Sequence, residues 1–238
     1  MSLFQLFLAC HIITGATGLV LFWTPVLSRK GGAFHRLYGK WFSYSMLATG
    51  SFASSMAIST IIAPIENHHG IEDLALVRAI FGWMMLYLGV LTVALAWHGL
   101  GVARNRADHA RNRAWLNVAL QIAMTATALN CAIRGAAIGQ PLMLGMASVG
   151  LIAGPMNLIY AFRARPGPRD YLIEHVKSSV GAGISVYTAF LAFGLVRAAP
   201  QLALNPLVWA LPTFIGLGII YYHRERILRG ARPAQAVR

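Results

Sequence analysis

Four clusters of basic residues, separated by long apolar segments, divide this chain. Seventeen of the 20 Lys and Arg residues fall within residues 29–40, 104–113, 163–177 and 224–238. Lys and Arg stay on the cytoplasmic side of a bilayer while apolar segments cross it, so this alternation constrains both the number of spans and their orientation. The pattern predicts an integral membrane protein.

A helix that crosses a membrane needs about 20 consecutive apolar residues. The segments that meet this requirement are 3–27, 37–63, 74–101, 114–138, 141–162, 172–197 and 206–223. Seven spans with all basic clusters on one side require the N-terminus outside and the C-terminus in the cytoplasm. Six or eight spans are the alternatives, because the last segment is short. We therefore predict an all-α bundle of about seven transmembrane helices, with residues 1–229 as a single domain and 230–238 as a short basic cytoplasmic tail.

Composition supports the same class. The chain is 57% hydrophobic and 11% charged, whereas a soluble domain carries about 25% charged residues. A net charge of +13 in a soluble chain would suggest a nucleic-acid partner. Because the charges here lie at the ends of apolar segments, we expect them to contact the bilayer and its anionic lipid headgroups, and we expect no nucleic-acid partner.

Three of the expected spans carry small residues at a spacing of four. These are Gly39, Ser43, Gly50 and Ser54 in span two, Gly150 and Gly154 in span five, and Gly181, Ser185 and Ala189 in span six. Small residues at this spacing let membrane helices approach closely. The pattern predicts that these spans form the packed centre, and lining a transport pathway is the functional alternative.

Span four carries a polar stripe, formed by Asn117, Gln121 and Thr125 at successive i+4 positions. Polar groups at membrane depth cost free energy unless they are paired, so this stripe is expected to face protein or water. Two interpretations stay open. The stripe forms hydrogen bonds between helices, or it lines a polar cavity.

Four histidines, His35, His98, His175 and His223, are expected at one depth, near the cytoplasmic ends of four different spans. Neutral imidazole ligates both metal ions and haem iron, so residues at one depth on several helices are candidate ligands. Histidine is also an ordinary residue at a membrane interface, because its ring is amphipathic.

Two stretches resemble the signatures of a bacterial family of multi-span membrane proteins of unknown function. Residues 31–40, Gly-Gly-Ala-Phe-His-Arg-Leu-Tyr-Gly-Lys, resemble its Gly-Gly-x-x-His-Arg-x-x-Gly-Arg/Lys motif between the first two spans. Residues 174–190, which open with Glu-His and end in Thr-Ala-Phe, resemble its second signature. The resemblance implies a multi-pass protein of the bacterial inner membrane, and it singles out His35, Arg36, Gly39 and His175.

The leading hypothesis is a redox-associated membrane protein that binds haem b. His35 and His175 are the expected iron ligands, Arg36 would pair with a propionate, and His98 is a further cofactor-binding candidate. In size and histidine placement the chain resembles small dihaem membrane cytochromes, although it lacks a second histidine pair in the outer leaflet. The alternatives are a transporter of a small molecule or ion, and an accessory subunit that packs against a membrane partner or a second copy.

Overall fold

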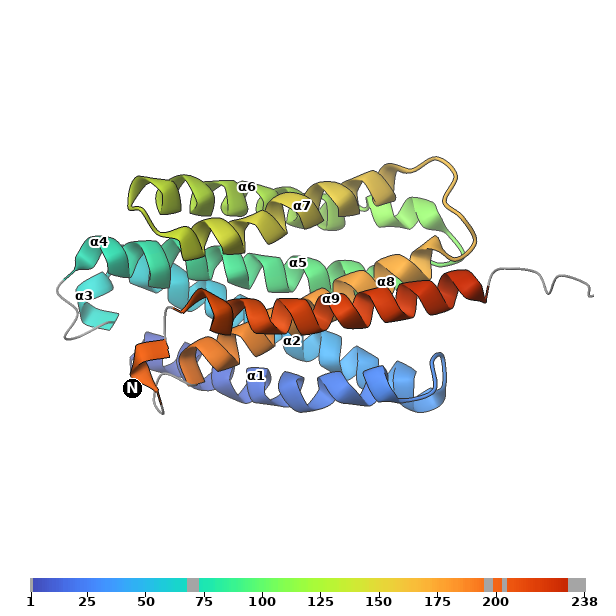
Figure 1. The fold of residues 1–238 in the computed structure, drawn as a ribbon, viewed down its shortest axis with the longest axis horizontal. Coiled ribbons are helices and arrows are strands. Elements are labelled where there is room, and N and C mark those ends of the chain that lie inside the picture. Colours follow the sequence, from blue (N-terminus) through green and yellow to red (C-terminus); the bar gives the residue numbers. More distant parts are fainter. Residues whose placement is uncertain (1, 68–72, 195–198, 203–204, 231–238) are drawn as a thin grey trace, which may run out of the picture.

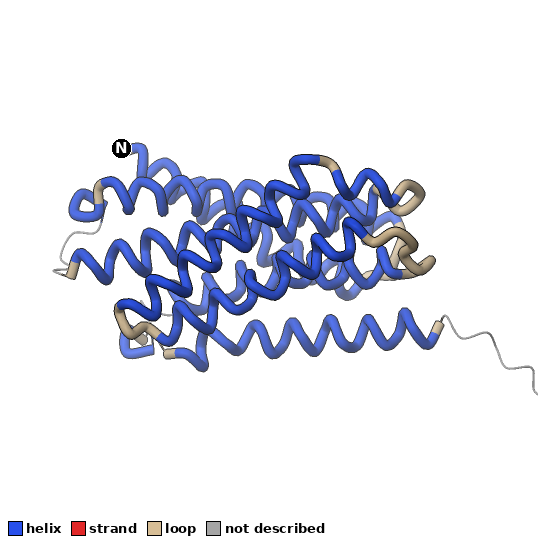
Figure 2. Tube along the Cα trace, turned by 90° about the horizontal axis from the view of Figure 1, so that it is seen from above, coloured by secondary structure: helices blue, strands red, loops and turns tan. Residues whose placement is uncertain are grey.

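The structure is a computed structural model that describes residues 2–67, 73–194, 199–202 and 205–230. Within these residues every regular element is a helix and no β-strand is present, which confirms the expected all-α class. The long helices run side by side along the long axis of the molecule, and both views show a single bundle (Figures 1 and 2).

The long helices are α1 (Leu3–Leu27), α2 (Ala33–Ile62), α5 (Met85–Arg104), α6 (Trp115–Ala137), α7 (Pro141–Phe162), α8 (Asp170–Ala189) and α9 (Pro206–Arg229). Short elements connect them: α3 (Pro64–Asn67), α4 (Leu74–Val77), the π-helix η1 (Arg78–Met84), the 3-10 helix η2 (His109–Arg113), the π-helix η3 (Phe190–Gly194) and the 3-10 helix η5 (Pro200–Leu202). Because α4, η1 and α5 follow without a break, they act as one helix from Leu74 to Arg104.

Five helices among the described residues are long and apolar enough to cross a membrane: α1, α2, the continuous helix Leu74–Arg104, α6 and α7. The sixth and seventh expected spans correspond to α8 with η3 and to α9. Charged residues lower the apolarity of both, since α8 carries Asp170, Glu174 and Lys177 and the last two turns of α9 carry arginines.

Apolarity marks where a span ends, but it does not mark where a helix ends. α2 begins at Ala33, four residues before the expected start, because Gly31 adopts a positive φ of 75° that turns the chain directly into the helix. α9 continues to Arg229, beyond the expected end at residue 223. Of the predicted basic tail, only Gly230 lies within the described residues.

The basic clusters gather at one end of the bundle. The turn between α1 and α2, the segment between α5 and α6, the turn between α7 and α8, and the end of α9 all lie on the right in Figure 1. We call this the basic end, comprising residues 28–32, 105–114, 163–169 and 224–230. The N-terminus, α3 and α4 lie at the opposite end; α3 contains Glu66, and Asp73 caps the start of α4.

The packed centre corrects the sequence prediction. In the most apolar window of the helix Leu74–Arg104, 61% of residues are buried, against 28% for α2 and 33% for α7. The third span is therefore the central helix, and α2, α6 and α8 pack around it. Patterns of small residues identify a close helix contact, but they do not show which helix lies in the middle.

Most of the small residues do serve close packing. A Cβ on Gly50 would lie 2.7 Å from the carbonyl oxygen of Gly89 on α5, and a Cβ on Gly150 would lie 2.6 Å from the ring of Tyr87. Gly39 is the exception, because a Cβ there would meet only Pro25, at 3.9 Å. At Gly39, therefore, the small residue does not mark a close helix contact.

Candidate functional site

His35 lies in the first turn of α2, beside the C-terminal end of α1. Its Nδ1 is 3.0 Å from the carbonyl oxygen of Pro25, and Lys30 donates from Nζ to the carbonyls of Pro25 and Val26. The last four carbonyls of a helix lack intrahelical partners and favour cations. His35 and Lys30 therefore complete the end of α1, and this contact fixes the orientation of the His35 ring.

His175 lies in the second turn of α8, at its crossing with α5. Its Nδ1 is 2.8 Å from the carbonyl oxygen of Gly99 and 3.4 Å from the hydroxyl of Ser179. A Cβ on Gly99 would come within 2.8 Å of the Ser179 hydroxyl, so only glycine allows this approach. The close crossing brings a backbone carbonyl of α5 to the His175 ring.

The structure brings His35 and His175 together. Their ring centroids are 6.2 Å apart and their planes are inclined by 75°. A carbonyl oxygen can only accept a hydrogen bond, so Nδ1 is the protonated nitrogen of each ring and Nε2 of the neutral ring carries the lone pair. This is the arrangement of metal-ligating histidines, in which a hydrogen bond from the second nitrogen fixes the tautomer.

The spacing of the two rings would allow both to ligate one metal ion. Two imidazoles that ligate one ion through Nε2, at about 2 Å each, place their centroids roughly 6 Å apart. The described residues contain no group of three or more His, Cys, Asp or Glu side chains that could hold a metal ion. His35 and His175 would be the two residues that hold haem iron if this group binds.

Positive charge surrounds the pair. Burial and the neighbouring Arg226 guanidinium lower the pKa of Lys30, as expected where cations gather. Arg36 is exposed, and its Nη1 donates to the carbonyl oxygen of Gly31 at 2.6 Å. In this position Arg36 stabilises the turn before α2, which is the structural role that competes with propionate binding.

His98, the further cofactor candidate, lies in a different set of contacts on α5 and is 1% exposed. Its Nδ1 is 3.2 Å from the amide oxygen of Asn117, and the Asn117 amide nitrogen donates to the carbonyl of Asn112 at 2.7 Å. Because the Asn117 nitrogen donates to Asn112, the Asn117 amide oxygen is the atom that faces His98. An amide oxygen accepts hydrogen bonds, so the His98 Nδ1 carries the proton. The His98 Nε2 lies 3.8 Å from a carboxylate oxygen of Glu174.

The polar stripe on α6 continues this network into the bundle. Gln121 accepts a hydrogen bond from the Asn157 amide at 2.9 Å and donates to the carbonyl of Ala94 at 3.3 Å. Both amide side chains are fully buried. Thr125 donates to the Gln121 carbonyl within its own helix. The contacts support the interpretation of the stripe as hydrogen bonding between helices.

The two other histidines near this level make separate contacts. The ring of His109 packs on Tyr160 at 4.8 Å, and Tyr160 also lies beside His98, with ring centroids 6.1 Å apart. The ring of His223 packs on Tyr222 at 5.2 Å. At the opposite end of α1, the Nδ1 of His11 is 3.1 Å from the carbonyl of Thr49. Among the described histidines only His35 and His175 form a ring pair.

Sequence reasoning missed three members of the His98 network: Glu174, Tyr160 and Asn157. Glu174 forms an ion pair of 2.6 Å with Lys177 one turn later, and the two side chains are only 14% and 20% exposed. Their i,i+3 spacing on α8 could have predicted the ion pair. The contact of Glu174 with α5 depends on the helix arrangement and has no signal in the sequence.

Comparisons with family models, curated proteins and solved structures found no match to this chain. The family resemblance therefore rests on the two signature stretches alone. Both stretches contribute to one site, since the first contains His35 and the second contains His175.

Proposed function

We propose that this chain is a multi-pass membrane protein that holds one haem b through His35 and His175. The observation that carries the proposal is the pair itself: two rings from α2 and α8 with centroids 6.2 Å apart. Each ring has its Nδ1 on a backbone carbonyl, which leaves Nε2 as the ligating atom. Bound haem would supply one-electron transfer.

The residues of the chain hold and orient the rings. The end of α1 positions His35 through the Pro25 carbonyl, and the Gly99 carbonyl positions His175 at the α5–α8 crossing. Hydrogen bonds of this kind also raise the basicity of a ligating imidazole. Lys30 adds positive charge beside the pair, which favours the anionic propionates of haem.

The same proposal includes the topology. We propose seven spans, with the N-terminus outside and the basic end in the cytoplasm, because Lys and Arg near short loops set orientation. The location at a bacterial inner membrane comes from the family resemblance. In this topology the His35–His175 pair lies near the cytoplasmic face, so a single haem there would exchange electrons with a partner on that side.

The test is haem binding by the purified protein after expression with ample haem. We expect one haem per chain and a Soret band that His35→Ala and His175→Ala remove or shift. His11→Ala is the matched control, because His11 also bonds a backbone carbonyl of another helix but has no second histidine ring beside it among the described residues. This variant should keep the wild-type spectrum.

The competing account is an edge-to-face ring contact, which has the same spacing of about 4.5–7 Å between centroids. On that account both substitutions lower stability and change no spectrum. A colourless wild-type protein would contradict the haem proposal and favour the transporter or accessory-subunit alternatives.

A further inference from the structure

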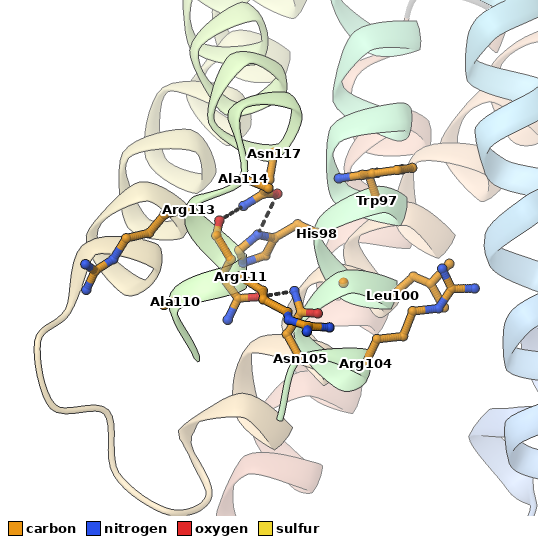
Figure 3. Close-up of a pocket in the computed structure, with 12 residues that line it drawn as sticks. Trp97, His98, Leu100, Arg104, Asn105, Ala110, Arg111, Arg113, Ala114 and Asn117 are labelled. Carbon is orange, nitrogen blue, oxygen red and sulfur yellow. Dashed lines mark hydrogen bonds between the residues drawn. The ribbon is translucent and has the colours of Figure 1, made fainter. Parts of the chain in front are cut away.

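A cavity of about 560 Å³ opens at the basic end, beside His98. It lies between the last turns of α5, the 3-10 helix η2 and the start of α6 (Figure 3). Side-chain amides of Asn105, Asn112 and Asn117 line it. Trp97, which is 36% exposed, contributes an apolar wall. The cavity therefore offers a ligand both polar groups and an apolar wall.

The rim of the cavity is strongly basic. Residues 104–113 contain four arginines and one acidic residue, Asp108. Arg111 pairs with Asp108 at 3.2 Å, but the two side chains are 74% and 54% exposed, and exposed ion pairs of this kind are weak. Arg104 is exposed and donates to the Tyr44 hydroxyl. Both guanidinium groups can exchange these partners for an anion.

Arg113 has a different role. Its Nε donates to the carbonyl of Ala161 at the end of α7, and in Figure 3 its side chain points away from the other lining residues. Arg113 thus stabilises a helix end, and Arg104 and Arg111 are the cations available at the cavity.

The start of α6 adds a second source of positive potential. Ala114, at its N-cap, makes no side-chain capping bond, and the first backbone N–H groups of a helix have no intrahelical partner. Ala114 lines the cavity, so the positive end of a 23-residue helix lies beside the two arginines. His98 also lines the cavity, with its Nε2 3.8 Å from a carboxylate oxygen of Glu174.

We propose that this cavity binds a phosphate group, held by Arg104, Arg111 and the N-terminus of α6. A phosphate offers several acceptor oxygens to donors that come from different directions, and bidentate arginine contacts suit it. Trp97 and Leu100 line the apolar side, where the glycerol and acyl chains of an anionic phospholipid would pack. A soluble phosphate monoester shares the recognised group.

The test titrates the detergent-solubilised full chain with glycerol 3-phosphate and, separately, with short-chain phosphatidylglycerol. Short-chain phosphatidylcholine controls for the acyl chains. We expect saturable binding that Arg104→Gln with Arg111→Gln weakens at least about ten-fold. Arg106→Gln is the matched control, because Arg106 is an exposed residue of the same loop that does not line the cavity. It should leave the affinity unchanged.

Binding of both probes identifies a soluble phosphate ligand, and binding of phosphatidylglycerol alone identifies a lipid. If the double variant fails to fold, Arg111→Gln alone should still weaken binding, since Arg111 pairs only with the exposed Asp108. Absence of binding by either probe, or equal weakening by Arg106→Gln, would overturn the proposal. The outcome does not depend on haem, so it is separate from the test of the His35–His175 pair.

Discussion

Two histidine sites share the crossing of α5 and α8, and they differ in what holds each ring. His98 on α5 faces Glu174 on α8, and the next residue of each helix forms the other contact, between Gly99 and His175. Amide side chains hold His98, whereas a backbone carbonyl holds His175. His98 therefore lies in a network of buried side chains, whereas His175 is held by a backbone carbonyl beside the ring of His35.

This difference separates stability from cofactor binding. Removal of His98 leaves buried amides without a partner, and such groups are costly in a protein interior. His35 and His175 are each only partly buried, and the carbonyls that they contact belong to helix ends or crossings. We therefore expect changes in the His98 network to lower the free energy of unfolding, and changes in the His35–His175 pair to alter the haem absorption spectrum.

The largest effect is expected for His98→Ala. The change opens a void where a ring is 1% exposed and leaves the Asn117 amide oxygen without its donor, so the free energy of unfolding should fall by about 2–4 kcal/mol. Denaturation in detergent measures this loss. The fraction that folds should keep the wild-type Soret band. A lost band with unchanged stability would instead make His98 a ligand.

A smaller effect is expected for Gly50→Ala, which tests the packing of α2, the helix that carries His35, against α5. Its Cβ would press on the Gly89 carbonyl at 2.7 Å, so the helix that carries His35 must move away from α5. We expect a loss of about 1–3 kcal/mol and a weaker haem affinity. Gly39→Ala is the control on the same helix, with 3.9 Å to its nearest neighbour. Equal effects of both substitutions would contradict the contact of α2 with α5.

The smallest effect is expected for Arg36→Ala. Its hydrogen bond to the Gly31 carbonyl is exposed, so its loss should cost less than about 1 kcal/mol. Haem affinity and the Soret position should stay unchanged, because Arg36 stabilises the turn. A clear fall in haem affinity would show that Arg36 contacts the cofactor and that the sequence hypothesis of a propionate partner holds.

The sequence predicts the helices well because a bilayer imposes long apolar segments. The expected spans 3–27 and 141–162 match α1 and α7 to the residue. The predicted helix bounds are too short where a helix extends beyond its apolar segment, as at the start of α2 and in the last turns of α9. Helical hydrogen bonds do not require apolar side chains. The central position of α5 was missed, since its burial depends on which helices surround it.

The site was predictable only in part. The position of each histidine within its span predicts that His35, His98 and His175 lie at the basic end. Which of these rings contact one another depends on which helices are neighbours in the bundle. The pairing of His35 with His175 requires α1 to end beside α2 and Gly99 to admit α8. The role of Arg36 at the Gly31 carbonyl also depends on the local turn. Spacing in the sequence carries no information on these contacts.

The most direct measurement of the central claim is electron paramagnetic resonance of the oxidised, haem-loaded protein. If His35 and His175 hold the haem iron, the ferric protein would be low-spin, because two imidazole nitrogens would ligate the metal. This account predicts a low-spin haem signal that His35→Ala and His175→Ala should each abolish while His11→Ala keeps it. A high-spin signal, or no haem signal after expression with ample haem, would contradict the ligand pair.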